Sequence, residues 1–505
     1  MLARKSTLIM TTDIIEALLA YVSLFFIARY MGPGDYGIIG FAMGFVGLFT
    51  FLSKLGFDEA HIKHISDGKD LGTCIGTFLV TKLGLVSLMV AVTVGAVFFW
   101  KLIIGRGFES STHEMAIFII LGYFILERIS NIFRVTFTAE KKIAKIRISR
   151  LISAITRVGA IIFVAVSDLG PIALAFCYVF GNIFLFAASL LLFRKHPIKK
   201  PSKEYFKSYS RFAMPLIFAS VSAVIMTNID KVLIQLFWAS EEVGYYFASL
   251  RICEFIVLAG TSMGLLLFPT ISEYHSKKSV ASIKNVLHLS ERYISMLTFP
   301  MVMGLIALAG PSAYILLSSS FSPSISVFRI LPFFALLYAL SIPFNAQFLG
   351  MGKPKLARNR VLIMICFNVI LNIILIPKDI QSLGIKLFGL GASGAAIATV
   401  VSYLVGLIYC RYFSWRLIKF KFNFRILLHL FAATIMAVIL YWIDVSGVVP
   451  IERWYELFVV GVLGLGIYIG ILIILREFTR KDFNFIMDTL NIKKMWKYII
   501  KEIKR

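Results

Sequence analysis

The sequence predicts an all-α integral membrane protein with about 14 transmembrane helices. Apolar residues make up 59% of the 505 residues and charged residues only 16%, whereas a soluble domain of this length needs more polar surface to cover its core. The apolar residues also gather in long runs, and a run of about 20 residues matches the hydrocarbon thickness of a bilayer. A helix satisfies its own backbone hydrogen bonds there, so helices are expected.

Short loops separate these runs, and none is long enough for an extramembrane domain. A water-using active site needs walls that such loops cannot supply, so the sequence does not indicate an enzyme. The predicted spans cover residues 8–30, 36–57, 75–100, 115–137, 148–168, 171–193, 211–237, 243–270, 290–309, 325–349, 357–376, 387–411, 425–444 and 454–475.

The basic residues of the loops lie mainly on one side of the predicted membrane. The net charge of +25 at pH 7 would by itself suggest a nucleic-acid partner. Most of the 52 Lys and Arg, however, fall in the termini and in loops on the side of the amino terminus. Because cytoplasmic loops carry such an excess, we expect a cytoplasmic-membrane protein with both termini cytoplasmic and no nucleic-acid partner. The predicted outer loops hold Arg29, Lys101, Arg106, Lys378, Lys386 and Arg453.

Cysteine and histidine positions indicate no disulfide, metal site or cofactor. Asp58, Glu59, His61 and His64 have a loosely metal-like spacing, but they lie in a predicted cytoplasmic loop among lysines, so we expect them to be solvated. The five cysteines have no close pair and read as small buried hydrophobic residues; they are Cys74, Cys177, Cys253, Cys366 and Cys410.

An internal repeat divides the helices into two lobes. The segment that ends at Gly37 resembles the segment around Gly244, and Lys142–Arg147 resembles Lys355–Arg360. The copies run in the same order and the same membrane orientation, as in transporters with parallel repeats and a binding site near the midplane. The expected parts are a first lobe with helices 1–6 (1–193), a basic cytoplasmic linker (194–210), a second lobe with helices 7–12 (211–411), two additional helices (412–475) and a basic cytoplasmic tail (476–505), which could form an amphipathic helix on the inner leaflet.

Several segments resemble the polysaccharide-biosynthesis (Wzx-type) flippases, which share a superfamily with MATE exporters and lipid II flippases. The resemblance covers roughly residues 8–411 and rests on the order and spacing of loose motifs. It implies two six-helix bundles in a V around a central cavity, and translocation of lipid-linked saccharides by alternating access. The motifs are Gly32-Pro33-Gly34-Asp35-Tyr36-Gly37, Asn228-Ile229-Asp230-Lys231, Gly350-Met351-Gly352-Lys353-Pro354-Lys355, Asn372-Ile373-Ile374-Leu375-Ile376-Pro377 and Gly391-Ala392-Ser393-Gly394.

Charged residues inside the predicted spans give an independent indication. A charge in the bilayer is costly, so it usually faces a cavity or a partner. Basic residues outnumber acidic ones, which suits an anionic passenger such as an isoprenoid phosphate, because Arg can bind phosphate bidentately. The bases are Lys82, Arg128, Arg134, Arg157, Lys231, Arg251 and Arg329, and the acids are Asp13, Glu16, Glu127, Asp230 and Glu254.

Arg128 and Arg157 lie nearest the middle of the bilayer, so we expect them to contact the substrate phosphate, followed by Lys82 and Arg251. The alternative for the seventh and eighth helices is structural. Asp230 and Arg251 reach similar depths in adjacent antiparallel helices, so an Asp230–Arg251 pair with Lys231 near Glu254 would hold the two helices together.

Asp13 and Glu16 lie one turn apart in the first helix and could bind Na⁺ or H⁺, which would couple transport to an ion gradient. Alternatively, they neutralise bases of the same lobe, such as Lys82. No other cofactor is expected.

The combined hypothesis is a monomeric flippase that moves an isoprenoid-phosphate-linked saccharide through a cationic central cavity. Three alternatives stay open, one of which is a nonspecific phospholipid scramblase. A MATE-like drug/ion antiporter would have twelve helices and a more acidic cavity, and a membrane-embedded glycosyltransferase or polymerase would have a long outer loop with catalytic acids.

Prolines predict where helices bend. Five of them fall within the predicted helices 7–10, so proline kinks are expected mainly there. They are Pro215, Pro269, Pro300, Pro332 and Pro343.

Overall fold

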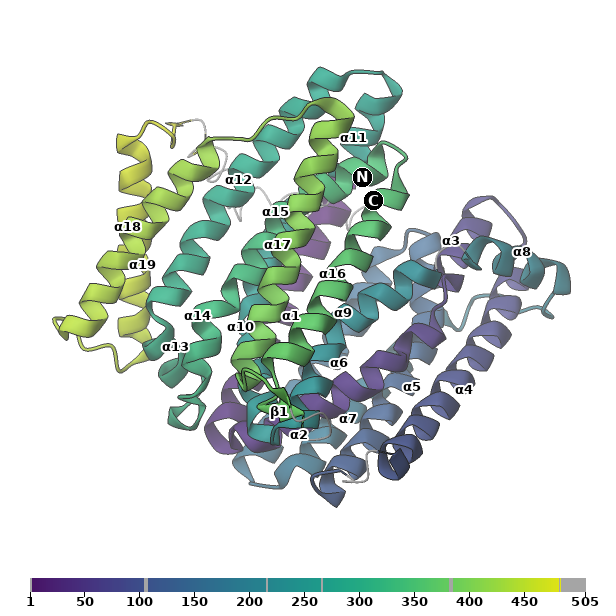
Figure 1. Ribbon diagram of the computed structural model, residues 1–505. Coiled ribbons are helices and arrows are strands. Elements are labelled where there is room, and N and C mark those ends of the chain that lie inside the picture. The colour runs from purple at the N-terminus through teal and green to yellow at the C-terminus, as the bar shows by residue number, and fades with distance from the viewer. Residues whose placement is uncertain are drawn as a thin grey trace. The chain divides into compact units, whose positions relative to one another are not determined.

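The computed structural model describes residues 2–103, 108–214, 217–264, 267–380, 385–480 and 482. The chain forms two compact units, Met1–Phe247 and Ala248–Arg505, and within the described ranges it is almost entirely helical (Figure 1). The unit boundary lies within a helix, after the first turns of α10. Arg106, Pro215 and the tail from residue 483 onward lie outside the described residues.

The first unit contains the expected first six helices, two short additional helices and the seventh helix. Its elements are α1 (Leu2–Tyr30), α2 (Gly32–Phe49), a 3₁₀ turn η1 (Thr50–Ser53), α3 (Phe57–Ser66), α4 (Leu71–Ile103), α5 (Ser111–Ala139), α6 (Ile143–Val166), α7 (Gly170–Phe193), α8 (Lys203–Ala213), α9 (Ile217–Phe237) and the start of α10 (Ser240–Gly264).

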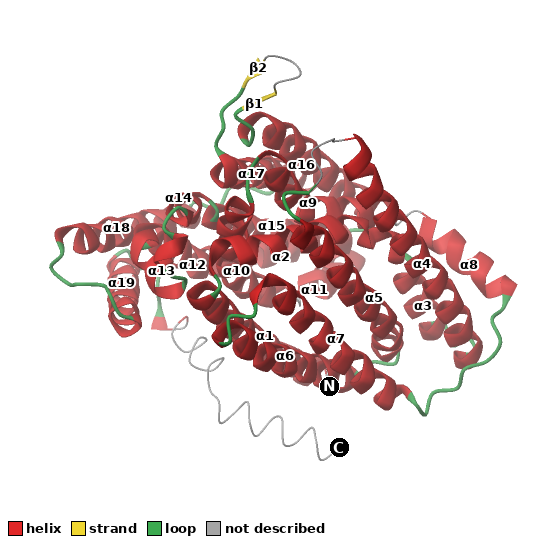
Figure 2. Cartoon of the chain, turned by 90° about the horizontal axis from the view of Figure 1, so that it is seen from below, coloured by secondary structure: helices red, strands yellow, loops and turns green. Residues whose placement is uncertain are grey.

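The second unit continues α10. It then contains α11 (Leu267–Ser276), α12 (Val280–Ala307), α13 (Ala309–Leu316), the turn η3 (Ser319–Phe321), α14 (Ser324–Ile330), α15 (Pro332–Gly350), α16 (Pro354–Leu375), strands β1 (Asp379–Ile380) and β2 (Ile385–Lys386), α17 (Gly391–Ile418), α18 (Arg425–Ser446) and α19 (Trp454–Ile474). The two strands pair antiparallel at one end of α16 and α17 (Figure 2).

The integral membrane class is confirmed, but the count of 14 spans is not. In the described part of the chain, 11 helices are long and apolar enough to cross a membrane, or 12 if α12 and α13, which meet at 82°, form one broken span. α9 and α10 occupy the expected seventh and eighth positions without passing that test; α10 carries Glu241, Glu242, Arg251 and Glu254.

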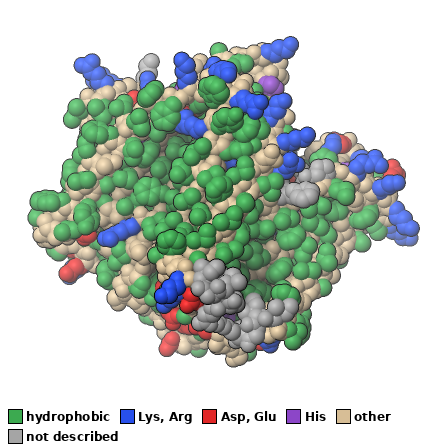
Figure 3. All heavy atoms as spheres, in the orientation of Figure 1, with side chains coloured by type: hydrophobic (Ala, Val, Ile, Leu, Met, Phe, Trp, Pro, Cys, Tyr) green, Lys and Arg blue, Asp and Glu red, His purple; other side chains and the backbone are tan. Residues whose placement is uncertain are grey.

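The outward surface agrees with a lipid environment. Large apolar side chains of α17 and α18 are exposed, among them Ile408, Phe431, Val438 and Trp442. In Figure 3 apolar side chains cover most of the visible face of these helices, and Lys and Arg gather near the α11–α12 and α15–α16 turns. Such a surface would be unfavourable in water.

Glycines on α2 allow the closest helix contacts in the first unit. A Cβ at Gly37 would overlap the carbonyl oxygen of Ser240, and a Cβ at Gly244 would overlap that of Pro33. Pro33 and Ser240 each precede their glycine by four residues, so the two glycines aligned by the repeat make reciprocal contacts. Further along α2, a Cβ at Gly47 would overlap the side chain of Asn228.

The prolines occupy several kinds of position. Pro300 and Pro343 lie inside α12 and α15, but Pro332 is the first residue of α15 and Pro269 lies in the first turn of α11. Proline at the start of a helix causes no kink, because its missing N–H has no intrahelical partner there.

Candidate functional site

Lys82 of α4 is completely buried and paired in the first unit. Its Nζ lies 2.6 Å from Oδ1 of Asp58 and donates to the carbonyl oxygen of Ser53 at 2.6 Å. Gly56, with φ +80°, reverses the chain after η1 and lets α3 bring Asp58 back onto α4. The other oxygen of Asp58 accepts a hydrogen bond from Asn131 of α5 at 2.9 Å.

A second charged group lies on α5, beside the first. Glu127 accepts from Arg134 at 2.6 Å and pairs with Nε of Arg128 at 3.1 Å. Lys54, at the end of η1, interacts electrostatically with Arg128, Glu127, Asp58 and Lys82.

We call these six residues the α4–α5 charge cluster: Lys54, Lys82, Arg128, Arg134, Asp58 and Glu127. Four bases face two acids, which leaves a formal surplus of two positive charges. Sequence reasoning singled out Lys82 and Arg128 but missed the roles of Lys54 and Asp58, because only the tight turn at Gly56 brings them together.

Asp13 and Glu16 of α1 are paired with arginines of α6. Arg147 donates to Asp13, and Arg150 Nη2 lies 2.6 Å from Glu16 Oε2. The expected alternative partner, Lys82, is instead occupied by Asp58.

Arg157 of α6 is half-buried, with its guanidinium 5.8 Å from the ring centre of Tyr178. Arg157 also interacts electrostatically with Glu16 of α1. Within the described ranges, no carboxylate comes close enough to Arg157 for an ion pair. Gly181 of α7 lets the stem of Arg157 approach closely.

The predicted residues of the seventh and eighth helices lie in two different units. In the first unit, Asp230 accepts a hydrogen bond from Tyr246 at 2.6 Å, and Lys231 donates to Asn228 at 3.2 Å. In the second, Arg251 pairs with Glu254 at 2.9 Å, with both side chains substantially exposed.

His61 and His64 are buried, so the expectation that they are solvated was wrong. They lie on the inner face of α3, where His61 hydrogen-bonds Tyr209 of α8 and Thr136 of α5, both at 3.0 Å. His64 hydrogen-bonds Ser208 of α8 at 2.9 Å. Burial, with the nearby charges of His64 and Lys82, lowers the pKa of His61 to about 3.

The basic linker is attached to α4 and not free. Lys199 N donates to the carbonyl oxygen of Gly72 at 3.1 Å, and its Nζ lies 2.7 Å from Asp70. Hydrogen bonds from Lys199 and from Thr73 lower the pKa of Asp70 to about 2.

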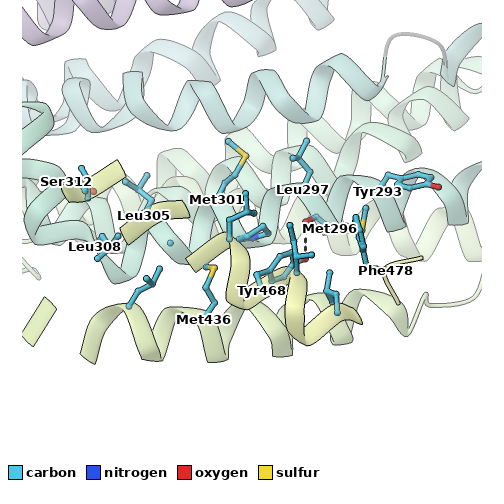
Figure 4. Close-up of a pocket in the computed structure, with 18 residues that line it drawn as sticks. Tyr293, Met296, Leu297, Met301, Leu305, Leu308, Ser312, Met436, Tyr468 and Phe478 are labelled. Carbon is cyan, nitrogen blue, oxygen red and sulfur yellow. Dashed lines mark hydrogen bonds between the residues drawn. The ribbon is translucent and has the colours of Figure 1, made fainter. Parts of the chain in front are cut away.

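The second unit contains an apolar groove of about 630 Å³ between α12, α13, α18 and α19. Figure 4 shows aliphatic side chains and methionines pointing into it from these helices. The hydroxyl of Tyr468 is turned to the backbone and donates to the carbonyl oxygen of Met296 at 3.0 Å. Lining residues include Leu297, Met301, Leu305, Met436, Gly461 and Leu465.

Next to the groove lies an ionic network that the sequence reasoning did not find. Arg292 of α12 donates to Glu477 at 2.5 Å and to both oxygens of Asp482 at 2.9 and 2.8 Å. All three side chains are buried. Tyr293 and Phe478, next to these residues in the chain, line the groove, so the network fixes the segment after α19 against α12.

Comparisons with known proteins identify a family from the sequence and a fold from the structure. A sequence model described as "Polysaccharide biosynthesis protein" matches residues 26–326. The probable low-salt glycan biosynthesis flippase Agl15 of Haloferax volcanii is 23% identical over 423 residues, which cover 84% of this chain and 85% of that protein.

Two solved structures share the fold. The lipid II flippase MurJ in an inward closed conformation has a TM-score of 0.75 at 17% identity, covering 92% of this chain and 98% of that one. An inward-facing MATE multidrug transporter of the MOP superfamily has a TM-score of 0.65 at 16% identity, covering 81% and 96%.

Proposed function

The chain belongs to the polysaccharide biosynthesis protein family, and we propose that it is a flippase that moves an isoprenoid-phosphate-linked saccharide across the cytoplasmic membrane by alternating access. The matched relative Agl15 is described as a probable glycan biosynthesis flippase, and MurJ, with the same fold, as a lipid II flippase. Both termini would be cytoplasmic, and the protein would act as a monomer.

The observation that carries this proposal is the positive surplus of the α4–α5 charge cluster. A phosphate or pyrophosphate would offset that surplus, and in surroundings of low dielectric constant the attraction is stronger than in water. Arg128 and Arg134 both pair with Glu127. The guanidinium of Arg128 therefore retains N–H groups that can donate to an anion. Arg157 would be a second phosphate contact in the proposed cationic cavity.

The groove of the second unit supports a lipid-linked cargo. An apolar groove of about 630 Å³ suits part of a polyprenyl chain, because each buried methylene contributes about 0.8 kcal/mol. A water-soluble drug would gain less from such a groove. This favours the lipid-linked saccharide over the antiporter alternative.

Deletion of the gene and analysis of lipid-linked saccharides tests the function. We expect these intermediates to accumulate on the cytoplasmic side and glycan export to return with the wild-type gene. Arg128→Glu and Arg157→Glu should fail to restore export at equal protein levels. Lys207→Glu, at an exposed position of α8, is the control and should restore it. Unchanged glycan export in the deletion strain would refute the proposal.

A further inference from the structure

Polar contacts join the turn before α5 to the end of α9 and the start of α10. Oε2 of Glu109 accepts from Gln235 Nε2 at 2.6 Å, from the backbone N of Ser240 at 3.2 Å and from its hydroxyl at 2.7 Å. His113 Nε2 lies 2.7 Å from the Ser240 hydroxyl, and its Nδ1 lies 2.9 Å from that of Ser110.

The carboxylate of Glu109 caps the first turn of α10 from outside the helix. Free N–H groups and the helix dipole make this position favourable for a negative charge. Ser240 and His113 are nearly inaccessible to solvent, whereas 42% of the Glu109 side chain is exposed. Water can therefore reach the carboxylate and replace its protein partners without a buried charge being left behind.

The same turn of α10 also contacts α2. The carbonyl oxygen of Ser240 lies against Gly37, and Gly244 lies against Pro33. One turn further, the rings of Phe247 and Tyr36 stack with their centres 4.8 Å apart. Glu109, α2 and α5 belong to the first repeat and Ser240 to the second, so these contacts join the two copies at one end of the helices.

We propose that Glu109 is a positioning residue of the transport cycle, whose carboxylate latches α10 to the first repeat and must release it when this side opens. The inference rests on the proposed alternating access, in which one repeat moves against the other. Contacts that join the repeats at one end can then persist only in the state in which that end is closed. The proposed orientation places this end outside.

A buried cysteine can report the release of the latch. The full chain would carry Phe247→Cys, with the native cysteines other than Cys74 replaced by serine. Phe247 is 2% exposed at the α2–α10 contact, and Cys74 is fully buried at the other end of α4. Labelling by a thiol reagent would be followed at both cysteines in purified protein, and at residue 247 from outside intact cells.

We expect Glu109→Ala to accelerate labelling of residue 247 about tenfold. A hydrogen bond to a charged acceptor stabilises the closed contact by a free energy that corresponds to about this factor in the opening equilibrium. Glu109→Gln, which keeps an acceptor oxygen, should restore part of the protection. Ser240→Ala should also accelerate labelling and should add little to Glu109→Ala. Labelling of Cys74 should not change.

The control is Glu114→Ala, which removes another carboxylate near the same turn. Oε1 of Glu114 lies 2.6 Å from Nζ of Lys101, and its loss should leave labelling of residue 247 unchanged. Parental labelling rates in both Glu109→Ala and Ser240→Ala would overturn the inference. Equal acceleration at residue 247 and Cys74 would also do so, since it would mean a generally loosened fold. If the latch responds as expected while deletion of the gene leaves glycan export intact, the proposed cargo fails and the latch stands.

Discussion

Individual charged residues in this protein are mostly paired, and the pairing decides what they can do. Asp13 and Glu16 each bind an arginine of α6. A proton or Na⁺ that neutralises these carboxylates would break the ion pairs that join α1 to Arg147 and Arg150 of α6. Coupling at this position would therefore change the contact between α1 and α6.

The first prediction concerns this coupling. Asp13→Asn with Glu16→Gln should remove the dependence of transport on a Na⁺ or proton gradient, because neither amide can exchange a cation. Transport into vesicles at several Na⁺ concentrations and pH values measures it. Coupling at this pair is excluded if the variant keeps both the rate and the ion dependence. Lys63–Asp67 is an exposed ion pair, and Asp67→Asn serves as control.

The second prediction concerns pH. Burial lowers the pKa of His61 in the folded protein to about 3, whereas the pKa of an unfolded histidine is about 6.5. Between these values the unfolded state binds more protons, so stability rises with pH and is lost as the pH falls below 6.5. The apparent Tm should fall between pH 7 and pH 5, and less in His61→Gln. The same dependence of Tm on pH in the wild type and in His61→Gln would contradict this account.

At the scale of elements, the long apolar helices could be predicted from sequence, whereas the short ones could not. α3 and α8 have ten or eleven residues, too few for an isolated helix to be stable. They are held by tertiary contacts, such as the His61–Tyr209 hydrogen bond. The repeat aligned Gly37 with Gly244, but sequence alone does not say that each touches the other's turn.

The third prediction tests this glycine contact. Gly37→Ala should destabilise the protein by about 1–3 kcal/mol, the usual range for forcing an extra methyl group into a packed site. Gly159→Ala is the matched control, because a Cβ there would meet no atom within 4 Å. Thermal unfolding in one detergent compares the two. Equal Tm values would show that α2 can move away from α10 at no cost.

At the scale of the whole molecule, composition and loop charges were sufficient to predict the membrane class, and the motifs to predict the family. The number of spans was not predictable, because α10 carries several charges and α12 and α13 meet at a sharp bend. The groove was not predictable either, since it joins helices far apart in the chain. Arg292 escaped notice because it lies at the edge of an apolar run and its partners follow the last span.

The fourth prediction concerns the groove. Gly461→Trp should fill part of its volume and reduce transport at least about tenfold, if the lipid chain of the cargo must lie there. Gly470→Trp changes the same helix at a position that does not line the groove, and it should transport normally. Equal transport by both variants would place the lipid chain elsewhere.

The central claim is that the α4–α5 charge cluster holds the phosphate of a lipid-linked cargo. Binding of a polyprenyl phosphate to the purified protein in lipid nanodiscs measures this directly, in the wild type and in Arg128→Gln. One lost bidentate contact should weaken binding at least about tenfold, and added salt should weaken the wild type more than the variant. Equal affinity of the two proteins at every salt concentration would contradict the claim.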